Sequence, residues 1–82
     1  MKESTCSQMF GRIYAIDVDE KAVYIKPEST LPATPFRVYA VDGVFQDIVI
    51  TIYSAWSARR HVRGTFYIDG SVLVHFEYRP AA

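Results

Sequence analysis

Pairs of a cation and a tyrosine, two residues apart, are the most suggestive chemical feature of this sequence. Three such pairs occur, in the stretches 12–14, 24–26 and 37–39. Side chains two apart on a strand share a face, so each pair places a cation beside an aromatic ring. Single-stranded nucleic acid needs such a face, because cations track its phosphates while rings stack on its bases. The sequence predicts one binding face, completed by two residues near the chain end: Arg12, Tyr14, Tyr24, Lys26, Arg37, Tyr39, Arg63 and Tyr67.

The same pairs have two simpler interpretations. Tyr beside Arg is ordinary cross-strand pairing on a solvated sheet, and both residue types are enriched at subunit interfaces. The acidic first turn, with Asp17, Asp19 and Glu20, also argues against a nucleic-acid ligand. Nucleic acid, a second copy of the chain and another protein therefore all stay open as occupants of this face.

A basic run at residues 59–63 is a second candidate for binding phosphate. Four arginines and two acids give residues 51–82 a formal charge of +2, against −2 for residues 1–50. A local basic edge can bind phosphate. The simpler interpretation is that Arg59 and Arg60 lie at the C-terminus of a helix, where cations are favoured.

His61, His75 and Glu77 form a third candidate cluster. In the hairpin that we expect, His61 faces Glu77, and His75 lies two residues away on the same face. Two imidazoles and a carboxylate are typical zinc ligands. Arg63 lies opposite His75 and would repel a metal ion. We therefore expect no metal, no cofactor and no catalytic residue.

Strands are the main elements that position these residues, because aromatic and β-branched residues are abundant. Alternation predicts strands at 8–17, 22–26 and 36–41, with a polar turn at 18–21 and a proline-rich loop at 27–35. In the first strand two sets compete for the core: Met9, Ile13 and Ala15 against Phe10, Tyr14 and Ile16.

A hairpin of strands 60–67 and 71–78 is predicted around Asp69-Gly70. A three-residue loop with Gly70 in the left-handed region pairs Phe66 with Val72 and makes one face wholly apolar. This register predicts that five residues are buried: Val62, Phe66, Val72, Val74 and Phe76. It predicts that the other face carries Arg63, Tyr67, Leu73, His75 and Glu77.

The segment from Asp47 to Arg60 has a mixed pattern. Residues 48–52 are all β-branched, which favours a strand. Yet Ile48, Ile52 and Ala55 follow helical spacing, and Asp47 is a good N-cap. We predict a helix near residues 47–59, and a strand at 44–53 is the alternative. A short sequence repeat, RIYAID at 12–17 and RVYAVD at 37–42, favours the alternative strand at 44–53. Strands of small β proteins also share such short sequences by composition alone.

Length and composition exclude several classes of protein. The 82 residues suffice for one domain, 1–82, with a flexible tail expected at 1–7. The net charge is zero, half of the residues are apolar, and no apolar run approaches the ~20 residues that cross a bilayer. A single cysteine and two histidines do not fit zinc-finger spacings, and the four glycines form no phosphate loop. Without an apolar leader, we expect a cytoplasmic protein with no membrane partner.

Two stretches carry a family resemblance. Residues 52–64 (IYSAWSARRHVRG) resemble the passage from helix to fourth strand in small bacterial OB-fold proteins, including the pentamer-forming B subunits of AB5 toxins. Residues 11–25 look like the opening hairpin of OB domains. The resemblance implies an all-β fold with one short helix, a five-stranded OB-like barrel in the order β-β-β-α-β-β. The alternative is a six-stranded barrel or a sandwich of three hairpins.

The toxin subunits carry a cysteine pair that this chain lacks, so no functional residue is carried over. We expect a small non-enzymatic binding or assembly module whose Arg/Tyr face contacts single-stranded nucleic acid. The alternative is a homo-oligomeric subunit that binds protein or glycan and has no nucleic-acid role. Self-assembly is expected in either case, because the predicted register leaves several apolar side chains outward: Tyr14, Tyr24, Tyr39, Tyr67 and Leu73.

Overall fold

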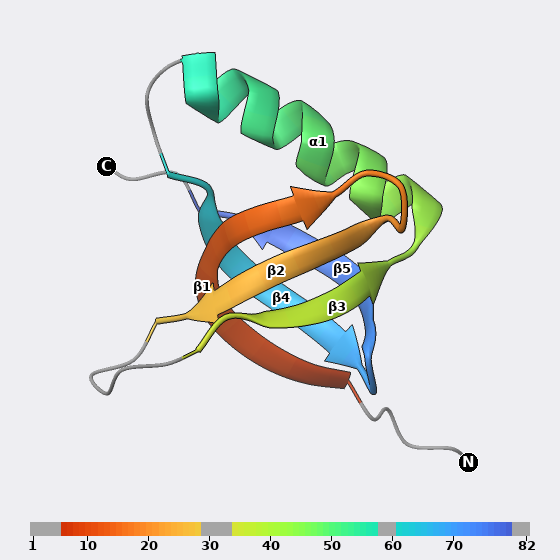
Figure 1. Ribbon diagram of the computed structural model, residues 1–82. Coiled ribbons are helices and arrows are strands. Elements are labelled where there is room, and N and C mark those ends of the chain that lie inside the picture. Colours follow the sequence, from red (N-terminus) through yellow and green to blue (C-terminus); the bar gives the residue numbers. More distant parts are fainter. Residues whose placement is uncertain (1–5, 29–33, 58–60, 80–82) are drawn as a thin grey trace.

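A computed structural model describes residues 6–28, 34–57 and 61–79. These contain five strands and one helix: β1 (Cys6–Asp17), β2 (Ala22–Pro27), β3 (Phe36–Ala40), α1 (Asp42–Ser57), β4 (Arg63–Asp69) and β5 (Val72–Tyr78). The strands close into a barrel in the order β1-β2-β3-β5-β4, and α1 lies across one end of it (Figure 1). All neighbours are antiparallel except β3 and β5. The protein is therefore mostly β with one helix.

The segment with the mixed pattern is helical, so the alternative strand at 44–53 is wrong. The helix begins at Asp42, five residues before the predicted N-cap, and the amide of Phe45 donates to the carbonyl of Val41 at 2.8 Å. Phe45, Ile48 and Ala55 are buried. Burial of this stripe outweighs the low helix propensity of the β-branched residues, which is under ~1 kcal/mol each. The predicted last turn at 58–59 lies outside the described residues.

Strand β1 bends around the barrel and pairs with two neighbours. It starts at Cys6, so the tail predicted at 1–7 is wrong for Cys6 and Ser7, while residues 1–5 lie outside the described residues. Gly11 pairs with Pro27 on one side and with Gly64 on the other. A Cβ on Gly11 would lie 2.6 Å from the carbonyl oxygen of Lys26, and one on Gly64 would lie 2.2 Å from that of Glu77. The barrel thus closes through two glycines because no side chain fits there.

A β-bulge between Ile13 and Ala15 settles which residues of β1 face inward. Ile13 and Ile16 both pack against the core, although they are three residues apart. Tyr14 and Ala15 are both exposed, because the extra residue shifts the alternation by one position. Tyr14 is consequently 62% exposed at the bulge.

The hairpin of β4 and β5 has a different register from the predicted one. Phe66 pairs with Phe76, and Asp69 pairs with Val72, so the turn is shorter than the predicted three-residue loop. Gly70 has a φ of 67°, in the left-handed region as predicted. The strand predicted to start at residue 60 is wrong for His61 and Val62, because β4 begins at Arg63, and residue 60 itself lies outside the described residues.

A second bulge, at Val74, corrects the predicted burial of β5. Ile68 pairs with Leu73 and Tyr67 with His75, which leaves Val74 without a partner in the ladder. Leu73 is fully buried and Val74 is 36% exposed, so the predicted directions of these two side chains are wrong. Ile68 of β4 points into the core, and its cross-strand partner Leu73 of β5 points the same way and is also buried. The remaining predicted core residues are buried or half-buried: Val62, Phe66, Val72 and Phe76.

The core fills the barrel between the sheet and α1. Its largest fully buried side chain, Phe66, stacks on Phe76 with ring centroids 4.7 Å apart. Inward-facing residues of β2 and β3 complete the core as predicted, with Val23, Ile25 and Val38 almost fully buried. The intervening side chains of β2 and β3 point outward, which creates the face considered next.

Candidate binding face

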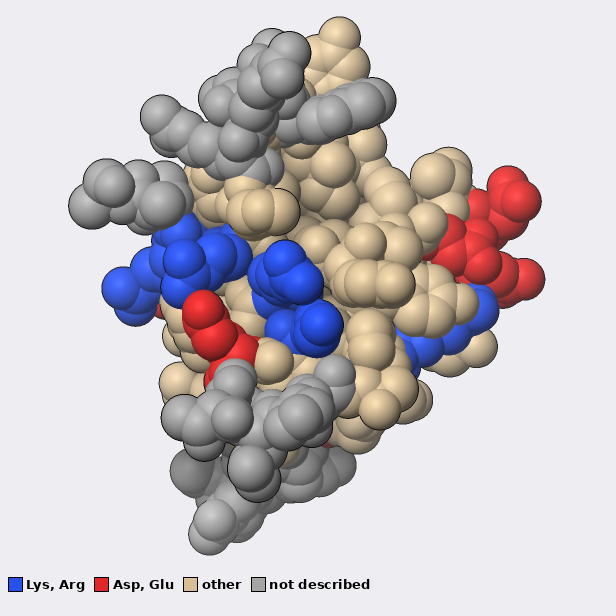
Figure 2. Space-filling view, turned by 60° about the vertical axis from the view of Figure 1, so that its left-hand side comes forward, with Lys and Arg blue, Asp and Glu red and all other residues tan. Residues whose placement is uncertain are grey.

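Three cations meet on the outside of the barrel where β4, β1 and β2 lie side by side. Arg12 of β1 is directly opposite Lys26 of β2 on one side and Arg63 of β4 on the other. They line a pocket of about 320 Å³, named here the basic pocket, together with Pro27, Glu28 and His61. Figure 2 shows Lys and Arg side chains gathered on this face of the molecule, with acidic side chains beside them.

The charges in the basic pocket do not balance. Nη2 of Arg63 donates to both carboxylate oxygens of Glu28, at 2.9 and 3.0 Å. Within residues 6–28, 34–57 and 61–79, Arg12 and Lys26 form no ion pair. Like charges directly opposite on neighbouring strands repel each other. Three cations against one carboxylate leave a local excess of positive charge that attracts anions.

Arg63 is held in place from two sides. Its guanidinium carbon lies 5.6 Å from the ring centroid of Phe10, and Glu28 holds the end of the side chain. Its Nε is buried and has no hydrogen-bond partner in the described part of the chain. A ligand cannot reach the buried Nε, so an anion would contact the exposed end of this fixed guanidinium.

An apolar hollow of about 230 Å³ adjoins the basic pocket. Its wall includes the bulge residue Tyr14, Ile52 of α1 and Val62, and His61 lines both cavities. The bulge turns Tyr14 outward, and its side chain is 62% exposed in the wall of the hollow. The two cavities therefore place an aromatic ring next to an anion-attracting pocket.

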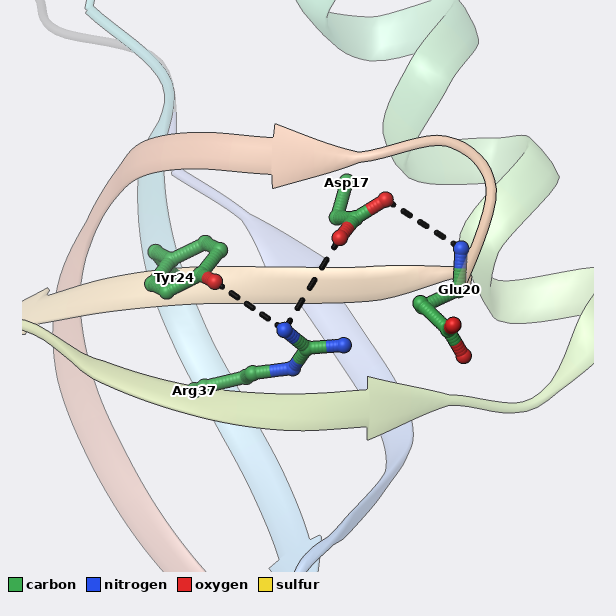
Figure 3. Close-up of polar contacts among 4 residues, drawn as sticks. All are labelled: Asp17, Glu20, Tyr24 and Arg37. Atoms are coloured by element: carbon green, nitrogen blue, oxygen red, sulfur yellow. Dashed lines mark hydrogen bonds and ion pairs between the residues drawn. The ribbon is translucent and has the colours of Figure 1, made fainter.

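The other predicted cation, Arg37, is already engaged. Its Nη1 donates to Oη of Tyr24 at 3.1 Å and lies 3.8 Å from Oδ2 of Asp17 (Figure 3). Its guanidinium carbon lies 5.2 Å from the ring centroid of Tyr39 and 5.7 Å from that of Tyr24. The hydrogen bond to Tyr24 is the main reason why the pKa of Arg37 is raised above its ordinary value. We name Asp17, Tyr24, Arg37 and Tyr39 the Arg37 cluster.

Asp17 also stabilises the turn between β1 and β2. Its Oδ1 accepts a hydrogen bond from the backbone amide of Glu20 at 3.2 Å (Figure 3). The same carboxylate therefore caps the turn and faces Arg37. The acidic turn that argued against a nucleic-acid ligand thus directs one of its charges into the Arg37 cluster.

The structure divides the eight predicted face residues into groups. Arg12, Lys26 and Arg63 share the basic pocket, with Tyr14 beside it, and Tyr24, Arg37 and Tyr39 share the Arg37 cluster. Tyr67 is separate, because its ring packs against His75, with centroids 5.2 Å apart.

The predicted Arg/Tyr face lacked three residues that the structure places there: Phe10, Glu28 and His61. Phe10 and Glu28 each lie two residues from a predicted cation, so the strand period offered a signal for both. Glu28 was instead assigned to the loop at 27–35, although β2 extends to Pro27. His61 was assigned to the zinc-like cluster and to the basic run at 59–63. The structure places His61 and Arg63 of that run in the basic pocket, and residues 59–60 lie outside the described residues.

The three residues of that zinc-like cluster do not come together. Glu77 pairs with Thr65 and not with His61, which precedes β4, and His75 pairs with Tyr67. Among the residues that the structure describes, no three His, Cys, Asp or Glu side chains are arranged to hold a metal ion.

The basic pocket and the hollow beside it are chemically suited to bind an anion and to stack an aromatic group.

In the described part of the chain, no helix has the length and apolar character to cross a bilayer. No protein-family model matches the sequence, and a comparison with curated proteins finds no match either.

Proposed function

We propose that this chain is a small, non-enzymatic binding module whose basic pocket takes phosphate groups of single-stranded nucleic acid. The observation that carries the proposal is the row Lys26–Arg12–Arg63, three cations in direct register on three strands with one carboxylate among them. Their mutual repulsion opposes folding unless a ligand or counterions neutralise it. A phosphate backbone supplies that neutralisation and releases condensed counterions.

The fold supports a single-strand ligand. We propose an OB-like architecture, since the closed barrel order β1-β2-β3-β5-β4, with a helix between β3 and β4, fits a five-stranded Greek-key barrel. In such barrels the ligand lies over strands 2 and 3. Here Lys26 and Tyr24 share that outer face of β2, so a bound strand can run from the basic pocket toward the Arg37 cluster.

Aromatic groups supply the second part of the proposed recognition. Tyr14 is 62% exposed beside the pocket, and Tyr39 is 48% exposed at the far end of the face. A base that stacks on such a ring contributes ~1–3 kcal/mol with little dependence on sequence. We therefore propose binding with weak sequence preference, in which the phosphates provide most of the affinity.

Two lysines provide a matched test of this proposal. Lys26 lies in the basic pocket, whereas Lys21 lies outside it and pairs with Asp42 at 2.8 Å. We expect fluorescence anisotropy with a labelled oligothymidine to show binding at low salt. Lys26→Ala should weaken that binding, and Lys21→Ala should not. In Lys26→Ala, the slope of log affinity against log salt concentration should become about 0.7 less negative, because one phosphate contact is lost.

Two results would contradict the proposal. One is the absence of oligothymidine binding at low salt, and the other is an equal loss of affinity in both lysine variants. An acidic peptide tested in the same assay represents the protein-binding alternative. Binding of the peptide but not of the oligonucleotide would favour a protein-interaction subunit with no nucleic-acid role.

A further inference from the structure

The outer side of α1 presents to solvent a stripe of three apolar side chains with Gln46 at one end. Gln46, Val49, Ile50 and Tyr53 follow one another at spacings of three, one and three residues, so they lie on one face of the helix. Val49 is 37% exposed, Ile50 59% and Tyr53 76%. The face opposite carries the buried core residues of the helix. We name these four residues the outer stripe.

The charge pattern of α1 is unusual for an exposed helix, whose solvent side is ordinarily charged. Two acids occur on the helix, and Asp47 lies on the flank of the outer stripe. Asp42 is in line with the stripe, but Nζ of Lys21 donates to its Oδ1 at 2.8 Å. The stripe therefore exposes an apolar surface with no unpaired charge along it in the described part of the chain.

A groove lies at one end of the stripe and a projecting ring at the other. The groove has a volume of about 490 Å³. Its wall combines the apolar side chains of Val18, Phe45 and Val49 with Gln46 and the Lys21–Asp42 ion pair. Tyr53 lies seven residues after Gln46, which is about 10 Å along the helix axis at 1.5 Å per residue. A knob and a matching hollow on one helix face are the elements of a self-complementary surface.

We propose that the outer stripe binds a second copy of this chain in an antiparallel, two-fold pair. A two-fold axis between Val49 and Ile50 places Gln46 of each copy opposite Tyr53 of the other. Each tyrosine ring then enters the groove of its partner, and both grooves are filled by one symmetric contact. The antiparallel arrangement also sets the positive end of each helix dipole beside the negative end of the other.

The size of the surface predicts a weak dimer. A helix of 16 residues is about 24 Å long, and its contact with an identical helix falls toward the low end of specific interfaces. We expect dissociation constants on the order of micromolar or weaker. No residue of the basic pocket belongs to the stripe, so the dimer leaves both basic pockets open.

Sedimentation over a range of concentrations, up to several hundred micromolar, tests the proposal. The natural chain should approach a mass of twice 9.4 kDa. Ile50→Glu buries a charge beside the axis in each copy and should weaken the dimer at least about tenfold. Val74→Glu is the control, because Val74 is also exposed but lies on β5. Circular dichroism checks that both variants are folded.

A cysteine at the axis provides an independent readout. In a Cys6→Ser background, Ile50→Cys should form a disulfide-linked dimer under mild oxidation, whereas Tyr14→Cys should not. A monomer at every concentration would overturn the proposal. The outer stripe would then be a binding surface for a different protein. A dimer that Ile50→Glu does not weaken, or equal cross-linking of both cysteines, would also overturn it by placing the interface elsewhere.

Discussion

The sequence contains two similar six-residue segments, RIYAID at 12–17 and RVYAVD at 37–42. The arginine that begins each segment differs in its surroundings: among the described residues, Arg37 is neutralised by its neighbours and Arg12 is not. Arg37 stacks on Tyr39, two residues further along its own strand, and bonds Tyr24 of β2. Arg12 lies opposite Lys26 of the same β2. The bulge after Ile13 turns Tyr14 toward the neighbouring hollow. Local sequence therefore does not decide whether a cation is neutralised; its neighbours across the strands do.

The aspartates that end the two segments follow the same logic. Asp17 ends the first segment but faces Arg37 of the second, at 3.8 Å. Asp42 ends the second segment and pairs with Lys21, at 2.8 Å. Within the described residues neither aspartate neutralises Arg12. The comparison separates a structural cluster, in which charges are satisfied internally, from a pocket whose charge is available to a ligand.

The largest expected effect is on binding, where the two arginines should behave differently. The double variant Arg12→Ala/Lys26→Ala should lower oligothymidine affinity by at least about 100-fold, since each charge-assisted contact contributes roughly 1.5–3 kcal/mol. Arg37→Ala should lower it less than about threefold, because Arg37 is already engaged. Titration at fixed low salt checks both values. Equal losses in the two variants would remove the distinction between the two regions.

Stability should show the reverse order. Arg37→Ala removes the partner of Tyr24 and Asp17, so it should lower the midpoint of urea unfolding. Arg12→Ala relieves repulsion from Lys26 and Arg63, so it should leave stability unchanged or raise it by a few tenths of a kcal/mol. Urea titrations of both variants in ligand-free buffer measure these changes. A clear loss of stability in Arg12→Ala would mean that the basic pocket is a structural cluster too.

Glu28 offers a way to sharpen the comparison. Glu28→Gln removes the one carboxylate of the basic pocket and leaves Arg63 free to contact a second phosphate. Oligothymidine affinity should rise about two- to threefold, and the salt slope should steepen by up to about 0.7. Glu20→Gln, in the exposed β1–β2 turn, is the charge-matched control. Unchanged binding in Glu28→Gln would show that Arg63 takes no part in recognition.

The smallest effect concerns the Lys21–Asp42 pair. The hydrogen bond from Lys21 lowers the pKa of Asp42. A carboxyl group whose folded-state pKa is depressed contributes stability above its unfolded value of about 3.9, and this contribution is lost as the pH falls through the folded value. At neutral pH, Lys21→Ala should unfold at a slightly lower urea concentration than the natural chain. This difference in unfolding midpoint should disappear below about pH 4, where Asp42 becomes protonated. A difference of equal size at pH 7 and pH 3 would exclude this ion pair as its source.

Much of the barrel follows from period-two alternation. Strands β2 and β3 were predicted to within one residue at each end, and their inward and outward sides are correct, because neither contains a bulge. The bulge at Tyr14 explains why alternation alone left the core side of β1 open, and the bulge at Val74 accounts for the wrong directions predicted for Leu73 and Val74. A bulge shifts the alternation to satisfy a neighbouring strand, so nothing local marks its position.

The candidate site was predictable only in part. Strand spacing correctly turned Arg12, Lys26 and Arg37 outward. Their surroundings depend on barrel closure, which brings Arg63 beside Arg12 although 51 positions separate them. The neutralising acids are also far away in the chain: Glu28 lies 35 residues from Arg63, and Asp17 lies 20 residues from Arg37. Excess charge in one region and balance in the other are therefore properties of the fold.

Amide chemical shifts recorded during titration with oligothymidine test the central claim most directly, because they locate the ligand. The account predicts the largest shifts at Arg12, Lys26 and Arg63, smaller shifts at Tyr14, and a response that disappears at high salt. The outer stripe of α1 should not respond. Shifts confined to the Arg37 cluster or to α1, or no shifts at low salt, would contradict the assignment of the basic pocket as the binding site.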